Sequence, residues 1–134
     1  MKELTAMTLT ELAAALKSGE TTSREATEAC LERIDRVEDK VGAFITVCAD
    51  EARKQADAAD ALRRSGAAVH PLCGVPVGVK DNICTEGVKT TCASRMLEDF
   101  VPPYSAHVWQ QARAAGCVLL GKLNMDEFAM GSTT

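Results

Sequence analysis

The sequence predicts an α/β fold in which an N-terminal helical layer precedes the first strands of a parallel or mixed sheet. Two capping boxes, at residues 8–11 and 22–25, begin amphipathic helices near the N-terminus. Two short apolar runs, at residues 75–79 and 117–120, have the composition of strands, and a helical pattern lies between them. Strand, helix and strand in this order predict a β–α–β unit.

The first two helices are predicted from their caps. Thr8-Leu9-Thr10-Glu11 begins a helix over 9–18 that Gly19 ends, and Thr22-Ser23-Arg24-Glu25 begins a second helix that runs to about residue 38. The apolar faces expected from helical periodicity are Leu9, Leu12, Ala13 and Leu16 in the first helix, and Ala26, Ala29, Cys30, the Arg33 stem, Ile34 and Val37 in the second.

A short extended run at 44–48 and a polar helix over 49–65, stopped by Gly66, complete the N-terminal region. The apolar stripe of this third helix is thin, so we expect the helix to lie across a surface. The stripe consists of Ala52, Ala56, Ala59 and Leu62.

The run at 75–79 alternates three valines with Pro76 and Gly78, which suits a pleated strand. Proline cannot donate a hydrogen bond to a neighbouring strand and glycine has no side chain to pack. The strand is therefore predicted to lie at a sheet edge, or to have another group close to its backbone. Lys80 stands at its carboxyl end, where binding sites form in open α/β sheets.

The remaining elements are a loop, a helix, a strand and a turn. Residues 82–91 are rich in turn and hydroxyl residues, and Ser105 is the expected cap of a helix over 106–115 that Gly116 stops. The helix is expected to bury Val108, Trp109, Ala112 and Ala115. The run 117–120 is predicted to be a buried parallel strand, and a short helical turn over 124–130 is expected to begin at Asn124 or Asp126.

Composition excludes several classes of function. The length suits one small domain, with a helical region over 1–69 and the start of an α/β core over 70–134. A net charge of −4 and an aromatic content of 4% argue against direct binding of nucleic acid. No run is long enough to span a membrane and no export signal begins the chain, so the sequence predicts a cytoplasmic protein.

Cysteine and histidine spacing predicts no metal site. The six cysteines are scattered without a C-x-x-C pair and are expected to be reduced, and the two histidines lie far apart. Residues 116–122 match G-x-x-x-x-G-K, but Leu123 stands where a phosphate-binding loop needs Ser or Thr, and the intervening residues form a strand pattern. Asp126 and Glu127 are a poor catalytic pair because adjacent helical residues do not face each other.

Three stretches carry a resemblance to a known family. G-V-P-V-G-V-K-D-N-I at 74–83 resembles the lysine-bearing segment of the amidase signature family, and T-T-C-A-S at 90–94 and G-K-L-N-M-D-E-F-A-M-G-S-T at 121–133 support this resemblance. The implied fold is part of the amidase signature fold. Within the family, the stretches resemble the glutamine-hydrolysing A subunits of tRNA-dependent amidotransferases.

The resemblance implies Ser–Ser–Lys chemistry with Lys80 as the catalytic lysine. A lysine that desolvation keeps neutral can accept a proton and so activate a serine. Asp81 and Asn82 are expected to orient the loop around Lys80, and Met130, Gly131 and Ser132 resemble a segment that lines the substrate pocket. From the residues alone, an ordinary surface lysine, or one paired with Asp81, remains an alternative.

The resemblance also implies partners and a missing part. Glutamine is the implied substrate, and ammonia passes to a B subunit that uses ATP and magnesium to act on misacylated tRNA. A small C subunit holds A and B together, and this chain itself is expected to need no cofactor. No G-G-S-S run occurs here, so we expect an N-terminal fragment that is inactive alone and that self-associates through exposed strand edges. The alternatives are a fragment of another amidase signature hydrolase and a helical docking module without catalysis.

Overall fold

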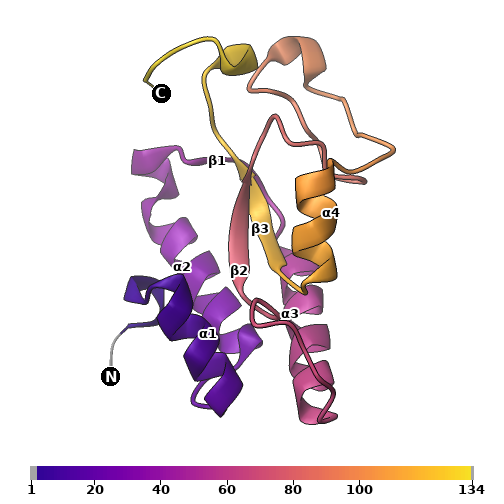
Figure 1. The fold of residues 1–134 in the computed structure, drawn as a ribbon. Coiled ribbons are helices and arrows are strands. Elements are labelled where there is room, and N and C mark those ends of the chain that lie inside the picture. The colour runs from indigo at the N-terminus through magenta and orange to yellow at the C-terminus, as the bar shows by residue number, and fades with distance from the viewer. Residues whose placement is uncertain (1–2, 134) are drawn as a thin grey trace.

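A three-stranded sheet forms the centre of the computed structural model, which describes residues 3–133 (Figure 1). The strands are β1 (Phe44–Val47), β2 (Pro76–Lys80) and β3 (Val118–Leu123), in the order β1-β3-β2. β3 pairs in parallel with β2 and antiparallel with β1. The sheet is therefore mixed, and both strands predicted from the apolar runs are confirmed.

Four helices surround the sheet: α1 (Leu9–Ser18), α2 (Ser23–Val41), α3 (Ala49–Arg64) and α4 (His107–Ala114). In Figure 1, α1 and α2 lie on one side of the sheet and α4 on the other. Both predicted capping boxes are present, with Thr8 paired to Glu11 and Thr22 paired to Glu25. α2 runs past its predicted end because the left-handed C-cap is Gly42, with φ of 61°.

The core comprises apolar clusters on both faces of the sheet. α1 and α2 bury Leu12, Leu16 and Ala26 against Val75, whereas Trp109 of α4 packs with Val79 and Leu119. A further cluster joins Leu31 and Ile34 of α2 to Leu120. The opposite directions of Leu119 and Leu120 follow from the alternation of side chains along a strand.

α3 packs on the sheet through its predicted alanine stripe. Ala52 and Ala56 are completely buried and contact Val118, so their small side chains allow α3 to approach β3 closely. Leu62, expected in the same stripe, is 47% exposed, and the buried position near it belongs to Asp60. Three of the four predicted stripe residues are therefore buried, and most other residues of α3 are at least partly exposed, as expected for a helix across a surface.

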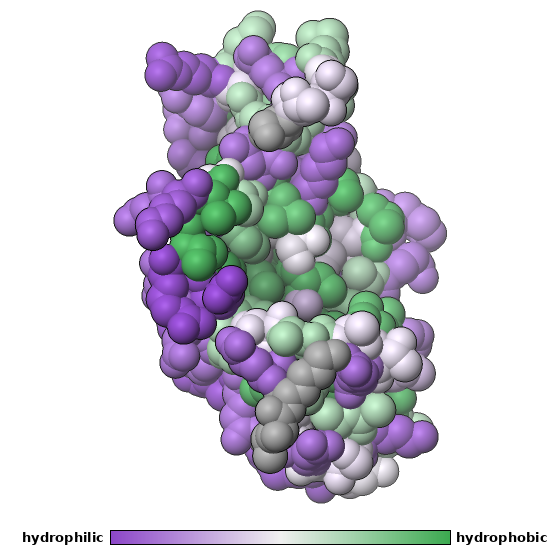
Figure 2. Space-filling model, turned by 90° about the vertical axis from the view of Figure 1, so that its left-hand side faces the viewer, coloured by the Kyte–Doolittle hydropathy of each residue, from purple (hydrophilic) through white to green (hydrophobic). Residues whose placement is uncertain are grey.

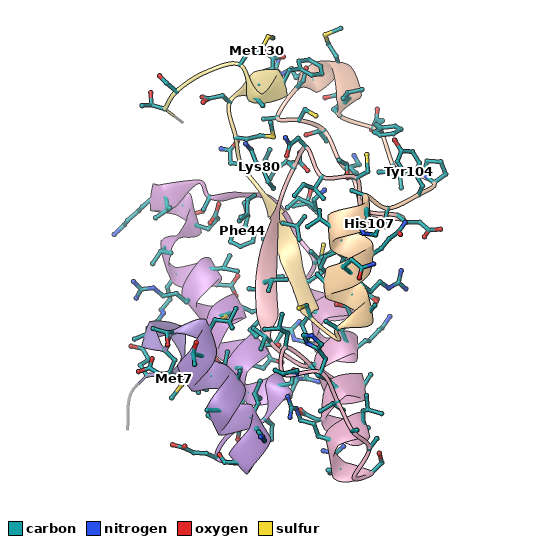
Figure 3. The ribbon with its side chains drawn as sticks, in the orientation of Figure 1. Met7, Phe44, Lys80, Tyr104, His107 and Met130 are labelled. Carbon is teal, nitrogen blue, oxygen red and sulfur yellow. The ribbon has the colours of Figure 1, made fainter. Side chains whose placement is uncertain are left out.

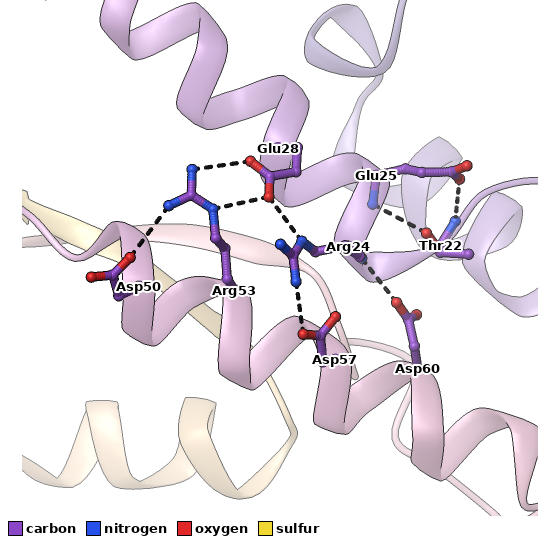
Figure 4. Close-up of polar contacts among 8 residues, drawn as sticks. All are labelled: Thr22, Arg24, Glu25, Glu28, Asp50, Arg53, Asp57 and Asp60. Atoms are coloured by element: carbon purple, nitrogen blue, oxygen red, sulfur yellow. Dashed lines mark hydrogen bonds and ion pairs between the residues drawn. The ribbon is translucent and has the colours of Figure 1, made fainter.

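Charged residues link α2 to α3 (Figure 4). Glu28 accepts hydrogen bonds from Arg24 and Arg53 at 2.8 and 2.9 Å. Arg24 also reaches Asp57 of α3 at 2.7 Å, and Arg53 pairs with Asp50. These guanidinium groups, Arg53 first, lower the pKa of Glu28 below its ordinary value. The charged face of α2 thus carries part of the contact between the helices.

Four other predictions about helix faces and caps were wrong. Leu9 is 52% exposed and Val108 is 61% exposed, so neither belongs to the core. The cap of α4 is Ala106, without a side-chain hydrogen bond, because the Ser105 hydroxyl instead accepts the N–H of Glu86 at 2.9 Å. In α2 the buried face includes Thr27 and Leu31, while Arg33 is exposed.

β2 satisfies both expectations for its Pro and Gly. It lies at the edge of the sheet, and the Leu123 side chain packs directly over Gly78. A register shift follows Val77, and Gly78 then pairs with Gly121 of β3. Near this shift the Leu119 N–H is satisfied by the Gln55 side chain of α3 at 2.8 Å.

The sheet draws on both halves of the chain, since β1 comes from the N-terminal region and pairs with β3. The domain boundary predicted between residues 69 and 70 stays a prediction. All six cysteines carry free thiols. Among residues 3–133, no helix combines the length and the apolar character required to cross a membrane.

Candidate functional site

Lys80 is the last residue of β2, at the carboxyl edge of the parallel pair (Figure 3). It pairs in register with Leu123, and its side chain is exposed. None of the ion pairs or side-chain hydrogen bonds among residues 3–133 involves Lys80. The strand end thus presents the amine as predicted, but the described residues do not bury it.

A second lysine, on the neighbouring strand, is buried. Lys122 of β3 has no exposed surface and is paired in register with Val79. Its ammonium donates to the backbone oxygen of Ile83 at 2.8 Å and to the Thr90 hydroxyl at 2.9 Å. Desolvation lowers the pKa of Lys122 below the ordinary value for lysine, and the attraction of Asp81 opposes this shift.

Asp81 is the partner of Lys122. Its carboxylate has no exposed surface, and its Oδ1 lies 3.6 Å from the Lys122 Nζ. Its Oδ2 accepts both the N–H and the hydroxyl of Thr91. Asp81 therefore holds Thr91 of the loop, and the lysine that it faces is Lys122.

Two strained backbone segments meet beyond this pair. Cys92 and Ala93 have φ of 51° and 54°, and Phe128 and Ala129 have φ of 52° and 59°. Such values are costly for residues with a Cβ, at about 1–3 kcal/mol each, and persist only where surrounding contacts hold them. The Phe128 N–H donates to the Cys92 oxygen at 3.0 Å, so the two segments support each other.

A side-chain contact joins the same segments. The Ser94 hydroxyl, which is buried, donates to the Glu127 carboxylate at 2.7 Å. The stretches 90–94 and 121–133, which carried the family resemblance, are thus in direct contact. The helical turn expected over 124–130 is only a short 3₁₀ turn at Glu127–Ala129, interrupted by the left-handed Phe128.

The other predicted site residues lie on the surface. Asn82 is exposed in the turn that follows β2. Met130 is 79% exposed on the turn above the sheet (Figure 3), and Gly131 and Ser132 are exposed beside it. Gly131 packs so tightly on Asp126 that an added Cβ would lie 2.5 Å from the Asp126 Cγ. The structure does not bring these residues together with Lys80 in a common groove.

Two surface depressions flank the carboxyl edge of the sheet. One, of about 290 Å³, is mainly apolar and is lined by Lys80, Val79, Val108 and Trp109. The other, of about 440 Å³, lies over the strained loop and has mostly polar or charged residues in its wall, among them Thr91, Ser94, Arg95 and Asn124. Within residues 3–133 no group of three or more His, Cys, Asp or Glu side chains is arranged to hold a metal ion.

Sequence reasoning missed Lys122. It occurs within the stretch that fails as a phosphate-binding loop, and the predicted strand ended before it, at Leu120. One signal was available, since Lys122 lies two residues after the apolar run 117–120, and a lysine buried beside such a run needs a charged partner. Its partner Asp81 lies far away in sequence, so spacing alone does not identify the pair.

Comparisons with known proteins indicate the family of the chain. The Amidase family model matches residues 25–134. The chain is 53% identical over 132 residues to the A subunit of the glutamyl-tRNA(Gln) amidotransferase of Moorella thermoacetica, and the match covers 98% of this chain and 27% of that protein. The corresponding protein of Roseiflexus sp. strain RS-1 is 56% identical over 128 residues, covering 96% and 26%.

A solved structure supports the fold. The peptide amidase of Stenotrophomonas maltophilia matches with a TM-score of 0.86 and 34% identity, over 92% of this chain and 26% of that one. The chain therefore spans about a quarter of the length of these relatives. Since the family model matches most of the chain and a solved amidase shares its fold, the chain belongs to the amidase family.

Proposed function

We propose that this chain forms the lysine-bearing part of the glutaminase centre in the A subunit of a glutamyl-tRNA(Gln) amidotransferase. The observation that supports the proposal is the position of Lys80 at the carboxyl end of β2, within a chain similar to such subunits over almost its whole length. A strand end holds the backbone of the lysine rigidly, while its exposed side chain remains open to groups from elsewhere in the enzyme.

In the proposed mechanism, Lys80 acts as a general base through a bridging serine. The proton of a nucleophilic serine passes through the bridging hydroxyl to the amine of Lys80. The serine oxygen then attacks the carboxamide carbon of glutamine, and the C–N bond breaks as the nitrogen gains a proton and leaves as ammonia. Water hydrolyses the resulting acyl-enzyme to glutamate.

Neither serine of this mechanism is assigned to a residue of the chain. The Ser94 hydroxyl already donates a hydrogen bond to the Glu127 carboxylate, and the Ser105 hydroxyl accepts one from the backbone N–H of Glu86. The isolated chain is therefore expected to release no ammonia from glutamine. Ammonia production by the purified chain would contradict the proposed division of the site.

The proposed assembly has three subunits in the cytoplasm. Ammonia released at this subunit passes to a B subunit, which uses ATP and magnesium to activate the glutamate of Glu-tRNA(Gln) and converts it to Gln-tRNA(Gln). A small C subunit joins A and B. This chain contacts the tRNA only indirectly, consistent with its net charge of −4.

The test replaces the matching segment of the Moorella thermoacetica relative by residues 1–134 and assembles the amidotransferase. We expect the chimera to hydrolyse glutamine, and Lys80→Met to lower kcat by about 10²–10⁴-fold, the usual contribution of a general base. Lys89→Met is the matched control, because Lys89 is an exposed lysine of the adjoining loop whose contact is an ion pair with the exposed Asp99.

The outcomes separate the proposal from the alternatives. An active chimera that Lys80→Met does not affect would remove Lys80 from the mechanism. A chimera that hydrolyses other amides but not glutamine would favour another type of amidase. Assembly with the B and C subunits without any Lys80-dependent hydrolysis would favour a docking role.

A further inference from the structure

We infer that the buried pair Lys122–Asp81 is a positioning element of the amidase centre, which sets the course of loop 81–94 and through it the place of Lys80. The inference rests on the proposed function, because it assigns a role within that reaction. Neither residue is itself placed in contact with substrate.

The burial of the pair has an energetic cost. Both side chains have no exposed surface, and the distance between the Lys122 Nζ and the Asp81 Oδ1 is 3.6 Å. Removing two charges from water is costly, and an apolar pair of similar size is often at least as stable. Stability alone is therefore a weak explanation for a lysine at position 122. The fixed geometry of the contacts that this lysine makes is a better explanation.

The contacts of Lys122 define that geometry. One ammonium group reaches Asp81, the backbone oxygen of Ile83 and the hydroxyl of Thr90. These three partners lie at the start and near the end of the loop, so a single side chain from β3 closes the loop over the sheet. Thr90 in turn donates to the Val88 oxygen at 3.1 Å, which extends the same network within the loop.

Asp81 connects the buried pair to the strained backbone segments through hydrogen bonds. Its Oδ2 holds both polar groups of Thr91, and its backbone oxygen accepts the N–H of Cys92 at 3.0 Å. Cys92 is the first residue of the left-handed segment 92–93. Its backbone oxygen accepts the N–H of Phe128, which begins the left-handed segment 128–129. Asp81 Oδ1 accepts no hydrogen bond among the described residues. The nearby Lys122 ammonium therefore compensates the negative charge of this buried oxygen.

The link to Lys80 is covalent. Asp81 follows Lys80 directly, and the Asp81 N–H donates to the Leu123 oxygen at 3.1 Å while the Ile83 N–H donates to the Lys80 oxygen at 3.0 Å. The side chain of Lys80 has no bonded partner among residues 3–133. Its location is therefore determined by its backbone, which pairs with Leu123, and by the course of the loop that follows, whose first residues Asp81 and Ile83 contact Lys122.

The experiment uses the assembled chimera with four variants: Lys122→Met, Asp81→Asn, the double variant and Thr91→Val. We expect each of the first two to lower kcat for glutamine by about 10–100-fold, because a small misplacement of a catalytic group has an effect of this size. KM should change by less than about twofold, since substrate binding is not removed. The double variant should lose no more than the worse single variant, because the two side chains act as one unit.

Controls distinguish positioning from simple stability. Rates are expressed per titrated active site, and thermal unfolding is measured for each variant. Lys54→Met should leave kcat unchanged within about twofold, because Lys54 is an exposed lysine of α3 outside the loop. A purely structural pair would lower Tm in the variants and leave kcat per active site unchanged, and this result would overturn the inference.

Two further outcomes keep the test decisive. If the Lys122→Met variant does not assemble, Asp81→Asn and Thr91→Val test the inference in its place, because both substitutions nearly preserve the shape of the side chain. An unchanged kcat in both variants overturns the inference. An active chimera that depends on Lys80 but not on Asp81 or Lys122 would leave the proposed function standing and refute the positioning role. A chimera without any glutaminase activity would refute both.

Discussion

At the scale of single residues, Asp60 fixes the start of α2 from a distance. Its carboxylate is 7% exposed and accepts the N–H groups of Ser23 at 2.8 Å and Arg24 at 2.9 Å. We expect Asp60→Ala to lower the free energy of unfolding by about 1–3 kcal/mol, because it leaves buried donors without a partner. Urea denaturation followed by circular dichroism measures this change.

Asp57, one turn earlier on α3, is the matched control. It also contacts Arg24, but its side chain is 58% exposed and its contact is a surface ion pair. Asp57→Ala should cost about 0–1 kcal/mol. Equal losses in the two variants would show that the contact with the N–H groups of α2 adds nothing beyond the surface charge.

The residues that the sequence predicted correctly are those with local partners. Each capping box joins residues three positions apart, so the pattern is visible in the chain itself. Asp60 and Lys122 escaped prediction because their partners Ser23 and Ile83 lie 37 and 39 residues away. Burial of a polar side chain is decided by the tertiary fold, and no local pattern encodes it.

At the scale of elements, the central strand β3 depends on one glycine. A Cβ added to Gly121 would lie 2.2 Å from the backbone oxygen of Thr46 in β1. Since this obstacle is backbone, the strands must separate to accept a side chain. We expect Gly121→Ala to destabilise the chain by about 1–3 kcal/mol, as overpacking does, measured by urea denaturation.

Gly78 is the control for this prediction, because it pairs with Gly121 across the ladder. A Cβ at Gly78 would meet only the end of the Leu123 side chain, at 3.0–3.1 Å, and that side chain can move. Gly78→Ala should therefore cost clearly less than Gly121→Ala. The opposite ranking would contradict the close approach of β1 to β3.

Element types were predictable from periodicity, whereas faces and some ends were not. β3 continues through Gly121 and Lys122 to Leu123, although glycine and lysine are poor strand formers, because β1 and β2 pair with it on both sides. Leu9 and Val108 fit the apolar periodicity but face solvent, since α1 and α4 have neighbours on only part of their surface. At these positions the neighbours in the tertiary fold outweigh the propensity and periodicity of the local sequence.

At the scale of the whole molecule, the candidate site is assembled from three separate stretches of sequence. The end of β2, the loop 90–94 and the turn 127–129 meet at one edge of the sheet. The sequence predicted the first as a strand end and identified the other two by resemblance. Their mutual contacts, through Phe128 N–H to Cys92 and Ser94 to Glu127, required the structure.

Some of the apolar surface of the molecule is exposed. Figure 2, which faces the side of α1 and α2, shows hydrophobic residues around a hollow in the middle of the molecule. On the other side, the outer edge of β2 has no neighbouring strand among residues 3–133, and beside it runs the apolar groove of Val79, Val108 and Trp109. Unpaired edges next to apolar surface favour association.

We therefore expect the isolated chain to self-associate as its concentration rises, and Val108→Lys to weaken this association. Val108 is 61% exposed in the groove, so a charge there does not disturb the core but must be desolvated when the groove is covered. The concentration of half-association should rise about tenfold or more, which corresponds to at least about 1.4 kcal/mol. Leu62→Lys, at a 47% exposed position of α3 outside the groove, should leave it unchanged. Light scattering decides: a monomer at all concentrations would contradict the expectation, and equal effects of the two variants would show that the association does not use the β2 edge.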